Sequence, residues 1–288
     1  MASMRDIKRR KESVQSTQQI TKAMKLVATV KLQKARSRAE NNKPYFKTLY
    51  RTICSILSKT EYVNHPYLTS NGSNRKAVIV ITSNRGLAGG YNSNLVKTIT
   101  KREDWSCEDV DIYAVGRKGY EALSRKGYRI VEDYSEVINE PLYKDAIEIS
   151  ERVLQSFTNG EVGEIYMAYT NFKNTVSQEA ELIQLLPLNL NPFDGMEVEK
   201  DDKVLMNYEP EAEEALSALI PKYIGNIIYG AFIEALASEN GARMQAMDSA
   251  TQNAEEMISD LSLKYNRARQ SSITQELTEI IAGAEAIS

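Results

Sequence analysis

The sequence ITQELTEIIAGAEA, residues 273–286, closes the stretch that decides the fold. From Glu211 to Ser288 apolar residues recur at steps of three and four among helix-forming residues, which predicts one very long helix. A helix of about 75 residues, rising roughly 1.5 Å per residue, would span on the order of 110 Å. Because this length exceeds the width of a globular domain, we expect the helix to project from the domain that carries it.

The apolar stripe of this helix is narrow and consists mainly of small or flexible side chains. It comprises Met247, Ala250, Ala254, Met257, Ile258, Leu261, Tyr265 and Ala268. Alanine and methionine allow a second helix to approach closely, but they pack less firmly than an Ile/Leu zipper. The final turns are more apolar, with Ile273, Leu277, Ile280, Ile281, Ala284 and Ile287. This apolar end predicts a binding partner, since the helix is too long simply to fold back on its own domain.

A second long helix is predicted at the amino terminus, from Ser3, a suitable N-cap, to about Ser58. Pro44 is expected to kink or end its first part. Its thin apolar stripe is Ile7, Val14, Ile20, Met24, Val27 and Val30. Residues 1–38 hold eleven Lys or Arg against Asp6 and Glu12. The excess positive charge leaves three alternatives open: nucleic acid, an acidic protein surface, or a solvated face.

Between the two helices, strand and helix patterns alternate. Strands are predicted at 77–81, 110–115 and 128–131, and helices at 95–101, from 119 to near 126, and at 142–157. Residues 164–186 are predicted to form two longer strands around 171–175, an antiparallel hairpin added at an edge. Alternation of this kind implies parallel pairing with right-handed crossovers. We therefore predict an α/β fold class. A Rossmann-like domain at 76–195 is predicted to be inserted between the N-terminal helix (1–58) and the C-terminal helix (208–288), and residues 191–202 form the linker out of it.

Composition excludes several classes of site. The 36 basic and 39 acidic residues nearly balance, and His65, Cys54 and Cys107 are too few for a zinc cage or a disulfide framework. His65 is expected in a loop, and the cysteines are expected to be reduced thiols of a cytosolic protein. The longest continuous apolar run, 77–81, is far too short to span a membrane. No cofactor, metal or catalytic residue is predicted.

The best candidate for an enzymatic site is the glycine turn SNRGLAGGYN, residues 83–92, which follows a strand and precedes a helix. Its spacing fits neither G-x-G-x-x-G nor the P-loop, so a packing turn is the favoured interpretation. Gly116 and Gly119 give the same weak indication. Acidic pairs are plentiful but lack an apolar pocket that would raise a pKa.

Several stretches together resemble one family, the gamma subunits of F-type ATP synthases. The C-terminal ITQELTEIIAGAEA resembles the family signature, and the other matching stretches are residues 238–258, 265–270, 4–10 and 20–36. The turn at 83–92 resembles a further motif, with Asn84 and Ala88 where the family usually has Asp and Cys. The resemblance covers the whole length in the right order.

The resemblance implies a non-catalytic rotor shaft, whose two terminal helices form a long antiparallel coiled coil inside a hexameric ring of alpha and beta subunits. It also implies an α/β foot beside the epsilon subunit and the c-ring, and membrane association only through that ring. Beta-subunit contacts carry over to Arg269, Gln270, Thr274, Met24, Arg243, Lys8, Arg9 and Arg10, and contacts with the c-ring or epsilon to Tyr208 and Glu209. A solvated coiled-coil face is the plainer interpretation of the shaft residues.

The family resemblance also implies a peripheral position on the cytoplasmic side of the cell membrane. We expect a bacterial form, because no Arg/Ser-rich transit peptide precedes the first helix. Two other functions remain open from the residues themselves. One is a nucleotide-binding enzyme built on 76–195, and the other is a coiled-coil nucleic-acid adaptor that uses the basic first helix.

Overall fold

The protein is described by a computed structural model covering residues 4–59, 65–188 and 212–285. The two long helices are α1 (Met4–Lys59) and α5 (Ala212–Glu285). By internal contacts the chain divides into two compact units. The paired-helix unit consists of residues 1–28 and 243–288, and the α/β unit of residues 29–242. Each unit is described by itself below.

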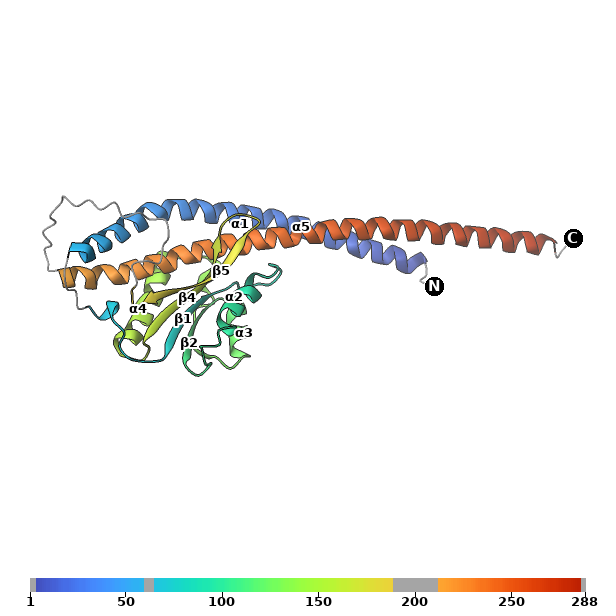
Figure 1. Ribbon diagram of the computed structural model, residues 1–288. Coiled ribbons are helices and arrows are strands. Elements are labelled where there is room, and N and C mark those ends of the chain that lie inside the picture. Colours follow the sequence, from blue (N-terminus) through green and yellow to red (C-terminus); the bar gives the residue numbers. More distant parts are fainter. Residues whose placement is uncertain (1–3, 60–64, 189–211, 286–288) are drawn as a thin grey trace. The chain divides into compact units, whose positions relative to one another are not determined.

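The α/β unit is built on a five-stranded sheet with the order β3-β2-β1-β4-β5. Its strands are β1 (Lys76–Ile81), β2 (Val110–Val115), β3 (Arg129–Asp133), β4 (Glu164–Phe172) and β5 (Gln178–Leu186). The first four strands pair in parallel, and β5 joins β4 as the antiparallel edge (Figure 1). The predicted α/β class and the edge hairpin are therefore confirmed.

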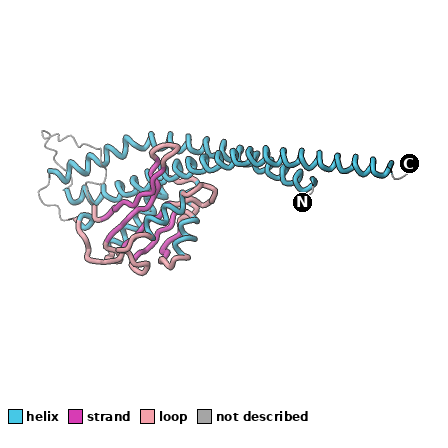
Figure 2. The backbone as a smooth tube through the Cα atoms, turned by 45° about the vertical axis from the view of Figure 1, so that its right-hand side comes forward, coloured by secondary structure: helices cyan, strands magenta, loops and turns pink. Residues whose placement is uncertain are grey.

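Helices cover both faces of this sheet, because alternate side chains of its central strands enter two different cores. Val78 and Val80 enter a core with side chains of α2 (Tyr91–Thr100) and α3 (Arg117–Ser124). Ala77, Ile79 and Ile81 enter a larger core on the other face, with α1, α4 (Tyr143–Thr158) and α5. Figure 2 shows the magenta strands lying among these helices.

Helix α1 runs without interruption through Pro44, so the prediction that this proline could end the helix is wrong. The proline lacks the N–H that would bond the Glu40 carbonyl, while its own carbonyl accepts from the Thr48 hydroxyl at 3.0 Å. Downstream of the proline, Leu49, Tyr50 and Ile53 are buried in the larger core. Packing of this segment against the sheet and α5 offsets the cost of the missing backbone donor.

The segment of α5 from Ser238 to Gly241 packs closely on strand β4. Ser238 is fully buried and its hydroxyl donates to the Thr170 carbonyl at 3.0 Å. A Cβ added to Gly241 would lie 3.3 Å from the Phe172 ring, tighter than an ordinary contact. One turn earlier, the Tyr91 hydroxyl donates to the Ala235 carbonyl at 3.2 Å. Small residues at 238 and 241 are thus required because the helix and the strand approach closely.

In the paired-helix unit the inward positions of both helices follow a heptad, with successive residues four and three apart. The inward residues of α5 are Met247, Thr251, Ala254, Ile258, Leu261, Tyr265, Ala268 and Ser272, and those of α1 are Ile7, Lys11, Val14, Gln18, Thr21, Lys25 and Ala28. The predicted α5 stripe is largely confirmed, although Met257 points outward with 43% exposure. Thr251 was missed because it is polar.

The predicted apolar stripe of α1 is partly wrong. Ile7 and Val14 lie inward, but Ile20, Val27 and Val30 are each more than half exposed. Thr21, at 8% exposure, occupies the inward position beside Ile20. We call the line of inward residues along which α1 and α5 meet the seam. Because several inward positions of α1 are polar, the seam lies about one residue away from the stripe that the apolar residues alone predict.

At the centre of this seam the hydroxyls of Thr21 and Thr251 lie 2.7 Å apart, and both residues are buried. We expect Thr21→Val to lower the free energy of unfolding by about 1 kcal/mol, because the buried Thr251 hydroxyl then loses one of its two partners and keeps only the Met247 carbonyl, at 2.8 Å. The double variant Thr21→Val/Thr251→Val should recover most of that loss, since valine has nearly the same shape. Urea unfolding of the four proteins in a double-mutant cycle measures the coupling. A coupling energy of zero would show that the hydroxyl pair contributes nothing.

By length and composition, α5 contains one stretch apolar enough to cross a membrane, and 61% of that stretch is buried within the protein. Its burial in the larger core explains the apolar composition. The prediction that the chain does not itself cross a membrane stays a prediction.

Candidate functional site

The glycine turn and the start of α3 form a closed hydrogen-bond network. Three backbone amides open α3, those of Arg117, Lys118 and Gly119. They donate to the Asn84 Oδ1 at 2.8 Å, the Ser83 carbonyl at 3.1 Å and the Thr82 Oγ1 at 2.8 Å, respectively. A phosphate at a helix N-terminus is held by free amides of this kind. Because all three already have acceptors, the start of α3 serves packing rather than phosphate binding.

His65 and Cys54 of the α/β unit lie in surroundings that disfavour their charged forms. His65 is buried, its Nε2 lies 2.9 Å from the Ser217 hydroxyl, and burial lowers its pKa against a smaller opposing effect of Glu213. Burial likewise raises the pKa of the Cys54 thiol. Within residues 4–59, 65–188 and 212–285, no group of three His, Cys, Asp or Glu side chains is placed to hold a metal ion.

The candidate contact residues lie instead on the paired-helix unit, where ion pairs and hydrogen bonds fix an antiparallel register. Gln18 donates to Glu255 at 2.9 Å, and seven residues further along α1, Lys25 lies 2.6 Å from Asp248. Lys22 adds a contact of 3.1 Å to Glu255. Part of the acidic neighbour predicted for the basic first helix is therefore α5 itself.

This register places the candidate residues along the pair. Met24 is half-buried and lies level with about residue 249, so half-buried Arg243 lies roughly 9 Å further along at 1.5 Å per residue. Extended to the start of α1, the register sets Met4 level with about Arg269, which is exposed. Lys8, Arg9 and Arg10 are exposed near that end, where Arg9 Nη2 lies 3.9 Å from Asp6.

Beyond Arg269, α5 continues to Glu285 without a described partner from α1. Gln270 and Thr274 are exposed on this overhang, where the Thr274 hydroxyl donates to the Gln270 carbonyl at 2.9 Å. The large apolar residues of the overhang are also exposed: Ile273 46%, Leu277 55%, Ile280 67% and Ile281 59%. When a helix end exposes this many large apolar side chains, it indicates a surface that a partner covers.

Two predicted positions cannot be placed in this geometry. Tyr208 and Glu209 lie outside the described residues, as do Ser3, Glu211 and the predicted linker 191–202. In contrast, Glu213 and Glu214 lie in the first turn of α5, where negatively charged side chains stabilise a helix by interacting with its dipole.

Sequence reasoning missed the polar cross-links of the seam. Thr21, Lys25, Asp248 and Thr251 all hold the two helices together, yet none belongs to an apolar stripe. The signal that identifies two of them is the heptad itself, because Thr21 and Lys25 fall on steps of three and four from Ile7 once polar residues are allowed at the inward positions.

Comparison with known proteins gives a consistent result. A family model described as ATP synthase matches residues 3–287. The ATP synthase gamma chain of Lachnoclostridium phytofermentans is 68% identical over 292 residues, covering all of both chains. The sodium ion specific ATP synthase gamma chain of Acetobacterium woodii is 40% identical, over 99% of each chain.

Solved structures share the fold. A chain of the Euglena gracilis mitochondrial ATP synthase superposes with a TM-score of 0.70 at 18% identity, covering 99% of this chain and 94% of that one. A chain of the Tetrahymena thermophila central stalk and c-ring gives a TM-score of 0.57 at 25% identity, covering 80% and 99%. On the strength of the full-length sequence matches, the chain belongs to the ATP synthase gamma chain family.

Proposed function

We propose that this chain is the central rotor shaft of an F-type ATP synthase. It transmits torque between the membrane c-ring and the catalytic beta subunits, and so couples ion translocation to ATP synthesis and hydrolysis. The observation that carries the proposal is the antiparallel helix pair with an exposed apolar end on α5. A shaft turning within a ring needs continuous helices and a terminal surface that its surroundings can cover.

The chain itself has no catalytic role in this proposal. The amides that open α3 are occupied by protein acceptors, which disfavours phosphate binding at the start of that helix. ATP chemistry then belongs to the beta subunits. Each face of the rotor makes different contacts with the beta subunit that it meets. These contacts change the relative stability of the conformations of that subunit's nucleotide site, and rotation therefore alters its nucleotide affinity.

The proposed contact residues divide into three groups. Arg269, Gln270 and Thr274 face a beta-subunit loop near the upper shaft, where a guanidinium facing an acid supplies a directional contact. Met24 and Arg243 lie lower, and Lys8, Arg9 and Arg10 add a basic collar. Tyr208 and Glu209 belong to a foot segment next to the c-ring and epsilon. The segment 76–195 forms that foot, and the membrane association is peripheral, on the cytoplasmic side, through the c-ring.

Affinity purification of the tagged full-length chain from membranes tests the proposal. We expect alpha, beta and epsilon subunits to be recovered in a fixed ratio with it. Recovery of a stable monomer without these subunits, or nucleotide turnover by the chain alone, would contradict the rotor assignment. Steeply salt-dependent binding of DNA or RNA would instead support the nucleic-acid adaptor.

Reversing the charge of Arg269 is expected to weaken the contact with beta while leaving the α/β unit folded. Arg269 is exposed, so Arg269→Glu removes no buried contact within the chain. A rim charge of this kind typically contributes through partner contacts rather than through folding. The measurement is coupled ATP synthesis in membrane vesicles, alongside the thermal midpoint of the purified chain.

Arg267→Glu provides the matched control, because Arg267 is also exposed on α5, two residues away on another face of the helix. We expect it to reduce coupling less than Arg269→Glu. If Arg269→Glu unfolds the chain, residue 269 is structural and the proposed contact is wrong.

A further inference from the structure

The chain contains three Asn-Gly sequences, at residues 71–72, 159–160 and 240–241. In such a pair the backbone nitrogen of the glycine can attack the side-chain carbon Cγ of the asparagine, because glycine has no Cβ to obstruct the approach. The Cγ–Nδ2 bond then breaks, ammonia leaves and a five-membered succinimide ring remains. Water opens this ring at either carbonyl to give aspartate or isoaspartate, so that the net change is ammonia exchanged for water. The rate depends on how freely the asparagine side chain and the following amide can move.

Asn71 is held in place by the hydrogen bonds of its own side chain. Its Nδ2 donates to the Phe157 and Val162 carbonyls at 2.9 and 2.8 Å. Its Oδ1 accepts from the Ser73 amide at 3.1 Å. Because all three hydrogen bonds must break before Cγ can approach the Gly72 nitrogen, the structure protects this pair.

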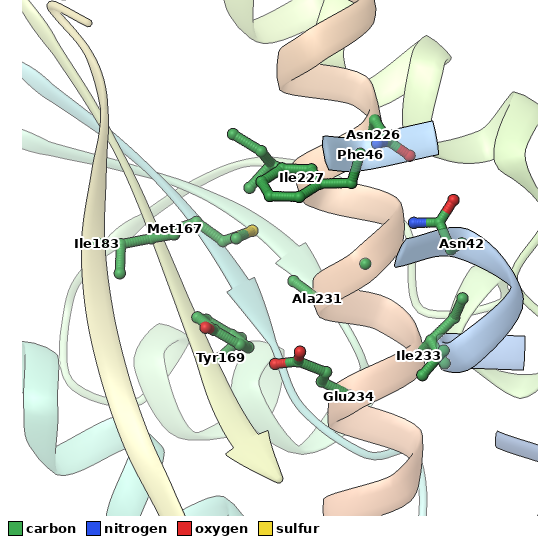
Figure 3. Close-up of a pocket in the computed structure, with 12 residues that line it drawn as sticks. Asn42, Phe46, Met167, Tyr169, Ile183, Asn226, Ile227, Ala231, Ile233 and Glu234 are labelled. Carbon is green, nitrogen blue, oxygen red and sulfur yellow. The ribbon is translucent and has the colours of Figure 1, made fainter. Parts of the chain in front are cut away.

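Asn240 is held by helix α5. Figure 3 shows this helix passing between the sheet, where Met167 and Tyr169 lie, and α1, where Asn42 lies. Further along the same helix, Asn240 is 3% exposed and its Nδ2 donates to the Leu236 carbonyl at 2.7 Å. A buried residue in a helix interior cannot turn toward the next backbone nitrogen unless the helix unwinds, so this pair is protected as well.

Asn159 differs from both, because it ends helix α4 on the protein surface. Residues 158–161 are all exposed, and the Asn159 Nδ2 donates to the Glu161 Oε1 at 3.3 Å. Gly160 has a φ of +75° and open space where a Cβ would lie. Ring closure requires the Gly160 amide to release the Phe157 carbonyl, 3.0 Å away. This release occurs at a helix end, where local opening costs least.

A reaction at this position would change the C-terminal cap of α4, which is a Schellman motif. The amides of Gly160 and Glu161 donate to the carbonyls of Phe157 and Ser156, each at 3.0 Å. Isoaspartate inserts one more carbon into the backbone before the Gly160 nitrogen, which displaces both donors. Aspartate keeps the backbone but places a carboxylate beside Glu161 and at the negative end of the helix dipole. Both products therefore destabilise the end of α4.

We propose that Asn159 is a site of spontaneous deamidation, and that its products weaken the C-terminal cap of α4. The reaction requires only the chain itself and water. It is independent of the shaft surfaces proposed above, because residues 156–163 all belong to the α/β unit.

Peptide mapping by mass spectrometry tests the site. The full-length chain is incubated in its folded state at mildly alkaline pH, which favours the deprotonated amide that attacks. Deamidation at each Asn-Gly pair is measured as the mass gained when ammonia is exchanged for water. We expect Asn159 to react at least about tenfold faster than Asn71 or Asn240, because the other two must first lose several hydrogen bonds or unwind a helix.

The same incubation in denaturing urea is the control, because it removes the structure that protects two of the pairs. The three rates should then agree to within about threefold. The proposed site is wrong if Asn71 or Asn240 reacts as fast as Asn159 in the folded chain. It is also wrong if Asn159 reacts in urea but not in the folded chain.

Urea unfolding of the aged protein tests the effect on the cap. The deamidated fraction, separated by its added negative charge, should have a folding equilibrium constant about tenfold lower than that of the fresh chain, the effect of lost capping hydrogen bonds. Asn159→Gln is the matched variant, because glutamine keeps the carboxamide but would have to close a less favourable six-membered ring. After the same incubation it should unfold like its own fresh sample. Unchanged stability of the deamidated fraction, or an equal loss in Asn159→Gln, would contradict the proposed weakening of the cap.

Discussion

Replacing Ala254 by proline is expected to break α5 in the paired-helix unit and to abolish coupled ATP synthesis. Ala254 lies in the heptad seam with only 5% exposure, in the interior of a 74-residue helix. Proline removes a backbone donor and clashes with the preceding turn, which costs about 3 kcal/mol or more in a helix interior. A rotor shaft with a broken helix cannot transmit torque past the break.

Two measurements follow the Ala254→Pro variant. Far-UV circular dichroism during urea unfolding should show lower stability of the helical signal. Fluorescence of Trp105, the one tryptophan in the chain, should report an intact α/β unit because that residue lies in the smaller core. Unchanged coupling in membranes would refute the need for a continuous helix.

A proline control separates helix breakage from the mere presence of the residue. Glu213 is exposed in the first turn of α5, where a proline lacks no intrahelical hydrogen bond. Glu213→Pro should therefore leave both stability and coupling close to those of the parent chain. If Glu213→Pro lowered stability and coupling as much as Ala254→Pro does, the location of Ala254 in the seam would not explain the effect of proline there.

The α/β unit was largely predictable from sequence because buried parallel strands have a strong local signature. The run 77–81 is continuously apolar, and glycines follow it where the chain must turn. The predicted strand at 110–115 has the same bounds as β2. Periodicity alone could not show that α1 passes through Pro44, because packing on the sheet decides that outcome.

The seam of the paired helices was less predictable for a different physical reason. Its central contacts are polar, so apolar periodicity places the stripe of α1 on exposed Ile20 and Val27 rather than on Thr21. The register of the two helices depends on which polar residue of α1 pairs with which polar residue of α5. The sequence of one helix alone does not contain that information. Roles of Arg269 and its neighbours were inferred from family resemblance, because an exposed residue carries no local signal of its partner.

Gly116→Ala is expected to destabilise the α/β unit strongly. The residue has φ of +114°, and a Cβ there would lie 2.1 Å from the Thr82 carbonyl oxygen. The obstacle is backbone, so either β1 or the start of α3 must move. Such movement would break the hydrogen bonds that Thr82 Oγ1 makes to the Gly116 carbonyl and the Gly119 amide, at 3.0 and 2.8 Å.

Strain at the backbone and displacement of packed atoms together should lower the free energy of unfolding by about 3 kcal/mol or more. Urea unfolding followed by Trp105 fluorescence measures it, because Trp105 shares its core with β1, β2 and α3. Gly72→Ala is the control, since Gly72 also has a positive φ, of +80°, but open space around it. It should cost only about 1 kcal/mol, the conformational part alone. Equal losses in both variants would show that backbone conformation, and not the close approach of Thr82, requires glycine at 116.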